Sequence, residues 1–180
     1  MILKLRTYAP EDFESLYRID QVCYEPGIAY SRRELRRYLQ FPGAECVVAE
    51  AVESAMGAPE AWRPDGRRDT GVARIEGFCI ATHEETRGYI VTIDVLAQYR
   101  RHGVGTTLLK EVEQRLAAQG VREVGLETAT DNESVVAFWQ KHGYRTRGVR
   151  KRYYPGGRDA FAMTKTLLAR TGHVIPESPT

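Results

Sequence analysis

The 180-residue chain is long enough to bury a hydrophobic core and has an ordinary length for one domain. Its 42% apolar and 28% charged residues are typical of a soluble globular protein, and no apolar run is long enough to cross a bilayer. The 26 Lys and Arg residues nearly balance the 24 Asp and Glu residues, so the net charge of +2 argues against general nucleic-acid binding but allows a local basic patch. We expect one domain over residues 1–168 and a C-terminal tail over residues 169–180.

The first half of the chain carries alternating strand and helix patterns. Residues 1–6 alternate apolar and basic side chains, which predicts a strand and not a signal peptide. A helix follows from Pro10, and the capping box formed by Ser31 and Glu34 predicts a second helix over residues 35–40.

Two further strands are predicted over residues 44–52 and 74–82. Residues 53–73 between them contain several Gly and Pro residues, and we interpret them as a flexible hairpin insert. Trp62 in this insert is either an aromatic anchor of the loop or a docking point for a partner.

The second half repeats strand, loop and helix. Strands are predicted over 89–96, 123–129, 144–153 and 159–167. A helix over 104–119 has one apolar face and ends at Gly120, and a short helix begins at the N-cap Asn132 and ends at Gly143. The sum is an α+β fold, a mixed sheet of about seven strands with helices on both faces.

The three cysteines predict reduced core thiols. Cys23, Cys46 and Cys79 are odd in number, widely spaced and set among apolar residues, unlike a disulfide framework or a metal site. This usage predicts a cytoplasmic protein without a metal. A catalytic cysteine is the alternative, but no histidine motif accompanies any of the three.

A glycine-containing loop, residues 100–105, joins the strand ending near residue 96 to the helix starting at Val104. Its backbone N–H groups would lie at the positive end of a helix dipole, which predicts an anion site. A Cβ at Gly103 or Gly105 would obstruct a diphosphate, and Arg100 and Arg101 add positive charge. Glycines there also serve simple turns. Neither a Walker motif nor a three-glycine dinucleotide fingerprint is present, which disfavours nucleotide triphosphates and NAD.

The Arg-x-x-Gly-x-Gly pattern of Arg100, Gly103 and Gly105 resembles the hallmark of the Gcn5-related N-acetyltransferases, the GNAT superfamily, and the order of elements agrees from Leu3 to about Leu167. The resemblance implies the GNAT fold and acetyl-CoA as the cosubstrate. It assigns the pyrophosphate to Arg100, Arg101, His102, Gly103, Val104, Gly105 and Thr106. It assigns the pantetheine arm to the backbone of Ile93 and Val95 and to Asn132.

Residues 89–106 more closely resemble the San-type N-terminal acetyltransferases, and residues 126–134, 143–144 and 150–155 resemble the bacterial RimI family. Both relatives acetylate protein N-termini, and RimI modifies a ribosomal protein. The resemblance therefore implies a protein or peptide N-terminus as acceptor, with a ribosomal protein as one candidate. We expect no direct nucleic-acid or membrane partner, and a monomer or weak dimer.

Two residues are candidates for the chemistry of acetyl transfer. Glu127 shares a strand face with the small residues Gly125 and Ala129, which leaves room beside a carboxylate that is either catalytic or an ordinary ion-paired surface group. It matches the general base of RimI. Tyr89 matches the catalytic tyrosine of San-type enzymes, where its hydroxyl deprotonates through water or assists the departing thiolate; the alternative is a half-buried strand aromatic.

Other candidates rest on the same resemblance. Trp139 stands where RimI has a catalytic tyrosine; an indole cannot deliver a proton, so Trp139 either orients the CoA sulfur or packs in the core. Tyr30, Tyr153 and Tyr154 match segments that narrow the entrance for a chain end. The competing hypotheses are an acetyltransferase for small amines or internal lysines, and a non-catalytic acyl-CoA-binding module.

Overall fold

The computed structural model describes residues 2–25, 27–52 and 74–167. The predicted insert over residues 53–73, with Trp62, and the predicted tail over residues 169–180 lie outside the described residues. The boundary near residue 168 therefore stays a prediction.

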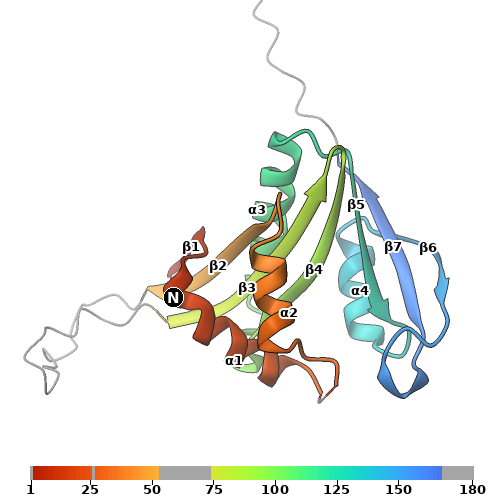
Figure 1. The fold of residues 1–180 in the computed structure, drawn as a ribbon, viewed down its shortest axis with the longest axis horizontal. Helices are drawn as coiled ribbons and strands as arrows, with labels where there is room; N and C mark the ends of the chain where they lie inside the picture. The colour runs from red at the N-terminus through yellow and green to blue at the C-terminus, as the bar shows by residue number, and fades with distance from the viewer. Residues whose placement is uncertain (1, 26, 53–73, 168–180) are drawn as a thin grey trace, which may run out of the picture.

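Seven strands form one mixed sheet in the order β1-β2-β3-β4-β5-β7-β6 (Figure 1). They are β1 (Ile2–Thr7), β2 (Glu45–Val52), β3 (Arg74–Glu84), β4 (Arg87–Val95), β5 (Glu123–Ala129), β6 (Arg145–Arg150) and β7 (Ala160–Thr166). All neighbouring pairs are antiparallel except β4 and β5, which run parallel. The predicted α+β class and mixed sheet are confirmed.

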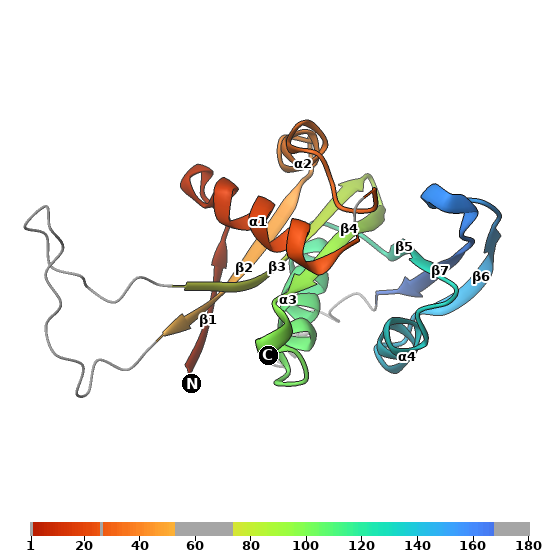
Figure 2. The ribbon, with the colours of Figure 1, turned by 90° about the horizontal axis from the view of Figure 1, so that it is seen from below.

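Helices cover both faces of the sheet: α1 and α2 lie on one face, α3 and α4 on the other (Figure 2). They are α1 (Phe13–Cys23), α2 (Arg32–Leu39), α3 (Val104–Ala118) and α4 (Glu133–Lys141). The predicted capping box begins α2, with the Ser31 hydroxyl accepting from the Glu34 N–H and the Glu34 carboxylate accepting from the Ser31 N–H. Asn132 caps α4 as predicted.

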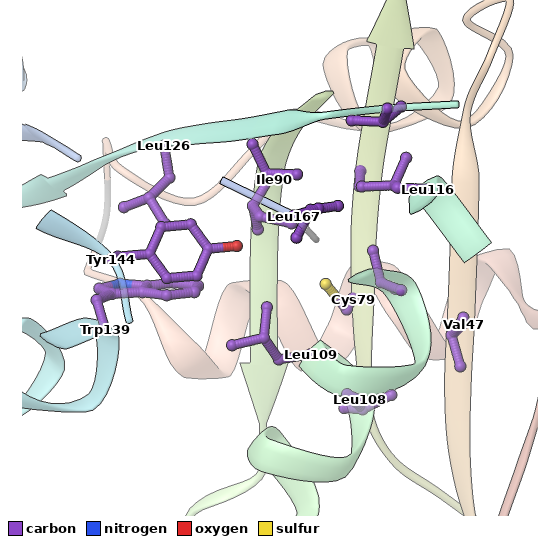
Figure 3. Close-up of a cluster of buried hydrophobic side chains, with 14 of the residues drawn as sticks. Val47, Cys79, Ile90, Leu108, Leu109, Leu116, Leu126, Trp139, Tyr144 and Leu167 are labelled. Atoms are coloured by element: carbon purple, nitrogen blue, oxygen red, sulfur yellow. The ribbon is translucent and has the colours of Figure 1, made fainter. Parts of the chain in front are cut away.

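Two hydrophobic clusters hold the helices on the sheet. The larger cluster lies between the sheet and helices α3 and α4 (Figure 3). The predicted apolar face of α3, namely Val104, Leu108, Val112 and Leu116, is buried in it. The second cluster joins α1 and α2 to the opposite face. Full burial of each such side chain contributes about 1.5–3 kcal/mol, which fixes β4 between two packed layers and holds β5 against the larger cluster.

Strands β4 and β5 separate soon after they meet. Only Arg87–Tyr89 of β4 pairs with β5, at Glu123–Gly125, and the strands diverge beyond that point (Figures 1 and 2). Within the same region Ala81 of β3 pairs with Ile90 and Ile80 pairs with Thr92, so Val91 is an extra residue that bulges β4. The rest of β4 therefore has no strand partner on its β5 side.

Candidate active site

The predicted anion loop lies between β4 and the N-terminus of α3. Gly103 is the N-cap of α3 in the left-handed conformation, with φ +84°, and Arg101 has φ +65°. The N–H groups of Val104, Gly105 and Thr106 belong to the first turn of α3, where a helix provides no internal acceptor. The loop thus presents N–H donors at the positive end of the α3 dipole.

The two loop glycines have different physical causes. At Gly103 a Cβ would meet nothing within 4 Å, so its positive φ, which favours glycine, explains the residue. At Gly105 φ is ordinary for a helix, and a Cβ would lie 3.7 Å from the Phe138 ring, an ordinary contact. Packing does not require glycine at 105, which fits the prediction that a ligand approaches the backbone there.

Side chains around the loop anchor it to its neighbours. The Arg100 Nε donates to the Val95 carbonyl at 2.8 Å, so this guanidinium is fixed at the end of β4. The His102 Nδ1 lies 2.8 Å from the Arg100 carbonyl oxygen. The role of both residues toward a pyrophosphate stays a prediction.

His142 ties α4 to this loop, a link that sequence reasoning missed. Its Nδ1 lies 2.8 Å from the Phe138 carbonyl and its Nε2 lies 3.1 Å from the Thr106 hydroxyl. Because a carbonyl only accepts, we assign the proton to Nδ1, and Nε2 then accepts from the hydroxyl. The Thr106 side chain is thereby held in place in the first turn of α3.

The free side of β4 carries backbone groups at its odd-numbered residues. The Val91 carbonyl accepts from the Tyr30 hydroxyl at 3.2 Å, and the Val95 carbonyl accepts from Arg100, so neither points into the β3 ladder. Backbone direction alternates along a strand, so Ile93 shares the orientation of Val95. The predicted backbone sites at Ile93 and Val95 thus lie on the side of β4 that has no strand partner.

Tyr89 and Glu127, predicted separately, are in direct contact. The Tyr89 hydroxyl donates to Glu127 Oε2 at 2.5 Å, across the point where β4 and β5 separate. The Glu127 side chain is only 9% exposed. The ion-paired alternative for Glu127 is also realised, because Arg150 Nε donates to its Oε1 at 2.6 Å.

The environment keeps the Tyr89 phenol neutral. Burial first, then the hydrogen bond to Glu127 and the neighbouring Tyr153, raise the pKa of Tyr89 well above its usual range. Tyr89 is therefore a neutral hydrogen-bond donor to the carboxylate. Its catalytic role, whether deprotonation through water or assistance to the departing thiolate, stays a prediction.

The predicted entrance tyrosines surround this pair. The Tyr154 hydroxyl donates to the Glu127 carbonyl at 3.4 Å, and the Tyr153 and Tyr154 rings pack edge to face at 5.0 Å. Burial raises the pKa of Tyr154 to about 12. With Tyr30 bound to Val91, all three predicted tyrosines lie near the separation of β4 and β5.

Two loops meet beside the entrance. Arg158, from the loop between β6 and β7, forms an ion pair with Glu25, from the loop between α1 and α2, at 3.2 Å. A Cβ added at Gly27 would lie 3.9 Å from the Pro155 side chain. The α1–α2 loop and the β6–β7 loop therefore lie against each other beside Tyr89 and Glu127.

Trp139 and Asn132 have structural roles in addition to the roles predicted for them. Trp139 is 4% exposed and packs edge to face on Tyr144 at 5.1 Å, within the core shown in Figure 3. The Asn132 side chain accepts from the Val135 N–H at 3.3 Å as the cap of α4. Contact of either residue with CoA stays a prediction.

A buried polar chain behind the entrance was not predicted. The Tyr24 hydroxyl lies 3.0 Å from the Thr92 hydroxyl, which donates to Asp94 Oδ1 at 2.8 Å. Asp94 is 1% exposed, and burial raises its pKa to about 7. Asp20 accepts from the Tyr30 N–H at 2.8 Å. Polar residues at positions 92 and 94 of an apolar strand were the available sequence signal.

The cysteines are free thiols, and Cys46 and Cys79 are buried as predicted. Burial raises the pKa of all three thiols, which is unsuitable for a thiolate nucleophile. Within the described residues no group of three or more His, Cys, Asp and Glu side chains is placed to hold a metal ion. None of the described helices has the length and apolar character to cross a membrane.

Comparison with known proteins identifies the family to which this chain belongs. The model described as "Acetyltransferase (GNAT) family" matches residues 13–144. N-alpha-acetyltransferase 50 of Danio rerio is 34% identical over 170 residues, covering 92% of this chain and 89% of that protein. An N-alpha-acetyltransferase of Sulfurisphaera tokodaii is 35% identical over 82 residues, or 45% of this chain. The chain matches 49% of that protein's length, and a similar share of other archaeal relatives.

Solved structures share the fold. The ribosomal-protein-S18-alanine N-acetyltransferase of Escherichia coli has a TM-score of 0.75 at 18% identity, covering 96% of this chain and 99% of that chain. A chain of the NatC complex bound to Gag peptide and CoA has a TM-score of 0.73 at 23% identity, covering 93% of this chain and 100% of that one. At these identities the likeness concerns the fold.

Proposed function

We propose that this chain, which belongs to the acetyltransferase (GNAT) family, transfers the acetyl group of acetyl-CoA to the N-terminal amine of a protein or peptide. The observation that carries the proposal is the contact between Tyr89 and Glu127 at the separation of β4 and β5. This contact sets a carboxylate beside the side of β4 that has no strand partner, and that side leads to the loop predicted to bind an anion at the N-terminus of α3.

The residues present fit acetyl-CoA. The N–H groups of residues 101–106 would hold its pyrophosphate, and the free backbone side of β4 at Ile93 and Val95 would bond its pantetheine arm. Missing side chains at Gly103 and Gly105 leave the backbone accessible. When bound, acetyl-CoA supplies the activated acetyl thioester.

Glu127 acts as the base for the incoming ammonium. The amine must lose a proton before its nitrogen forms a bond to the thioester carbonyl carbon and the carbon–sulfur bond breaks. An α-amine has a pKa near ~8, so a modest base suffices, and general-base catalysis contributes about 10²–10⁴-fold. Glu127 takes the first proton directly or through one water and releases it to solvent. It then takes the second proton, which the nitrogen loses as the amide forms, and can pass that proton to the departing sulfur.

Tyr89 and Arg150 orient the base. Tyr89 donates to one carboxylate oxygen and Arg150 to the other, so the Glu127 side chain is held from both sides. Because Tyr89 remains a neutral phenol, its part is to position the carboxylate. This refines the Tyr89–Glu127 pair expected from the resemblance.

The acceptor is a chain end. Contact between the α1–α2 and β6–β7 loops, together with Tyr30, Tyr153 and Tyr154, supports a narrow entrance that favours a protein N-terminus over a lysine within a chain. The relative from Danio rerio, an N-alpha-acetyltransferase, supports the same choice. A ribosomal protein is one candidate acceptor, through the fold shared with the Escherichia coli enzyme.

The test is turnover of acetyl-CoA with a library of peptides that have free N-termini, measured as released CoA and as peptide mass. N-terminally blocked peptides containing lysine, and small amines, are the controls. We expect acetylation of free N-termini. Acetylation of blocked lysine peptides or small amines alone would contradict the acceptor assignment, and binding of acetyl-CoA without turnover on any amine would contradict the enzyme assignment.

A further inference from the structure

Positive charge is concentrated in one segment that borders the site. Residues 145–158 contain six basic residues and no Asp or Glu, although the whole chain has a net charge of only +2. The six are Arg145, Arg147, Arg150, Lys151, Arg152 and Arg158. The segment comprises β6, which is the edge strand of the sheet and exposed at every residue, and the loop toward β7.

Arg150 connects this basic segment to the base. Its Nε donates to Glu127 Oε1 at 2.6 Å, and its side chain is 59% exposed. Among the described residues no partner is found for its two Nη nitrogens. A guanidinium has five donors in a planar fork, so one Arg150 can hold Glu127 through Nε and offer both Nη groups to a second carboxylate.

The position of Arg150 limits what that carboxylate can be. An acceptor amine must come within hydrogen-bond reach of Glu127, directly or through one water. Consecutive Cα atoms are about 3.8 Å apart, so the side chains just after the first residue of the acceptor lie within reach of a guanidinium that bonds the same Glu127. The Nη groups of this exposed side chain, held beside Glu127, would thus lie near the early residues of an incoming chain.

Resting on the proposed function, we infer that the preferred acceptor is acidic at its second or third residue, and that Arg150 binds that carboxylate. The other cations of residues 145–158 add a field that attracts such a chain. Lys151 and Arg158 are paired with Asp159 and Glu25, whereas Arg145, Arg147 and Arg152 have no ion pair within the described part of the chain. Arg150 supplies the contact, and the unpaired cations supply attraction at longer range.

Edge protection is the competing explanation for this charge. Exposed cations on an edge strand prevent pairing with other chains, and β6 is such a strand. That explanation predicts aggregation when the cations are removed, and it predicts no discrimination among peptides. The two explanations therefore differ in a kinetic measurement.

The experiment compares three peptides that share a good first residue and differ only at residues two and three, which are Asp, Ala or Lys. We expect kcat/KM to be highest with Asp and lowest with Lys, with about 10- to 100-fold between Asp and Ala, as for one hydrogen bond to a charged group. The difference should lie mainly in KM, because the contact forms on binding.

Two variants distinguish a direct contact from the general electrostatic field. Arg150→Gln removes the proposed contact, and the matched variant Arg145→Gln removes a cation at the other end of β6. Arg150→Gln lowers activity on every peptide because Glu127 loses a partner, so the readout is the ratio of kcat/KM for Asp and Ala peptides within each variant. We expect most of this ratio to be lost in Arg150→Gln, mainly through KM, with a small remainder due to the other cations, and to be largely retained in Arg145→Gln.

Three outcomes would overturn the inference. One is a ratio near one in the unmodified protein while free N-termini are still acetylated, which leaves the proposed function intact. Another is an equal decrease of this ratio in both variants, which would show that the preference comes from the general positive charge and not from contact with Arg150. The last is aggregation of the variants with an unchanged ratio in the soluble fraction, which indicates edge protection alone. If no amine is acetylated, it is the proposed function that fails.

Discussion

The Glu127 carboxylate is held by two donors of different character. The buried Tyr89 hydroxyl binds one oxygen and the half-exposed Arg150 guanidinium binds the other. The phenol restrains the carboxylate from inside the sheet, and the guanidinium restrains it from the edge. A carboxylate positioned in this way would need little rearrangement to act as the proposed base for an ammonium.

Replacement of Glu127 by Gln should lower kcat by about 10²-fold or more, because the amide cannot accept the ammonium proton. Tyr89→Phe should cost less, about tenfold, because one orienting hydrogen bond is lost while the base remains. Steady-state kinetics on the best library peptide measures both.

Tyr144→Phe is the matched control for Tyr89→Phe. It removes another buried hydroxyl, one that donates to Glu113 at 3.0 Å, so it should lower thermal stability and leave kcat unchanged. Wild-type kcat in both Glu127→Gln and Tyr89→Phe would contradict the catalytic assignment.

Asp94 makes stability depend on pH. Its pKa is about 7 in the fold because it is buried, against an unfolded value of 3.8. Because the folded pKa of Asp94 is higher than its unfolded pKa, its contribution to stability is fully present at pH values below the unfolded pKa. That contribution is lost as the pH rises toward the folded pKa. Between those values the loss is roughly 1.4 kcal/mol per pH unit.

Asp94→Asn should therefore become progressively more stable than the unmodified protein as pH rises from 5 to 7. The difference in Tm should grow by roughly 3–6 °C per pH unit, since asparagine stays neutral. Thermal melts across this pH range measure it. A constant difference in Tm would show that Asp94 is ionised throughout.

At the scale of elements, local signals located helices and strands well. The capping box of Ser31 and Glu34, the N-cap Asn132 and the stop at Gly120 depend on contacts within a few residues, so sequence alone places α2, α4 and the end of α3. The start of α1 was less exact, because Pro10–Asp12 forms a separate 3-10 turn in which Asp12 binds Arg6 at 2.6 Å.

Contacts between residues far apart in the chain could not be predicted from the sequence. Arg150 reaches Glu127 only because β7 lies between β5 and β6, and because the β6–β7 register shifts between Thr146 and Gly148. Neither the strand order nor the shift leaves a local signal. Tyr89 and Glu127 were each found by resemblance, but their contact depends on the parallel pairing of β4 with β5.

The α3 N-terminus allows a test with two glycines. In Gly105→Ala the new Cβ makes only ordinary protein contacts and alanine is favoured over glycine in a helix, so Tm should be unchanged or slightly higher while KM for acetyl-CoA rises several-fold. Gly103→Ala should lower Tm as well, because the left-handed conformation costs a residue with a Cβ about 1–2 kcal/mol. Melts without ligand and acetyl-CoA titrations distinguish them. An unchanged KM in Gly105→Ala would contradict the close approach of a ligand.

At the scale of the whole molecule, the separation of β4 and β5 divides the backbone hydrogen bonding of the sheet into two parts. Strands β1–β4 and strands β5–β7 are joined by only three residue pairs, Arg87–Tyr89 with Glu123–Gly125. The hydrophobic cluster on the α3 side continues across this division. Side-chain packing therefore holds the two parts of the sheet together where backbone hydrogen bonds between them are absent. The backbone of β4 remains available there for a ligand.

A ligand that bonds along β4 and at the α3 N-terminus should stabilise the whole fold. At a concentration about 100 times its Kd, acetyl-CoA should add roughly 2.7 kcal/mol, or about 5–11 °C in Tm. A nucleotide with the same pyrophosphate but no pantetheine arm, tested at the same concentration, is the control. It should give a smaller shift because it lacks the bonds predicted at Ile93 and Val95. An equal shift from both ligands would show that the unpaired side of β4 takes no part in binding.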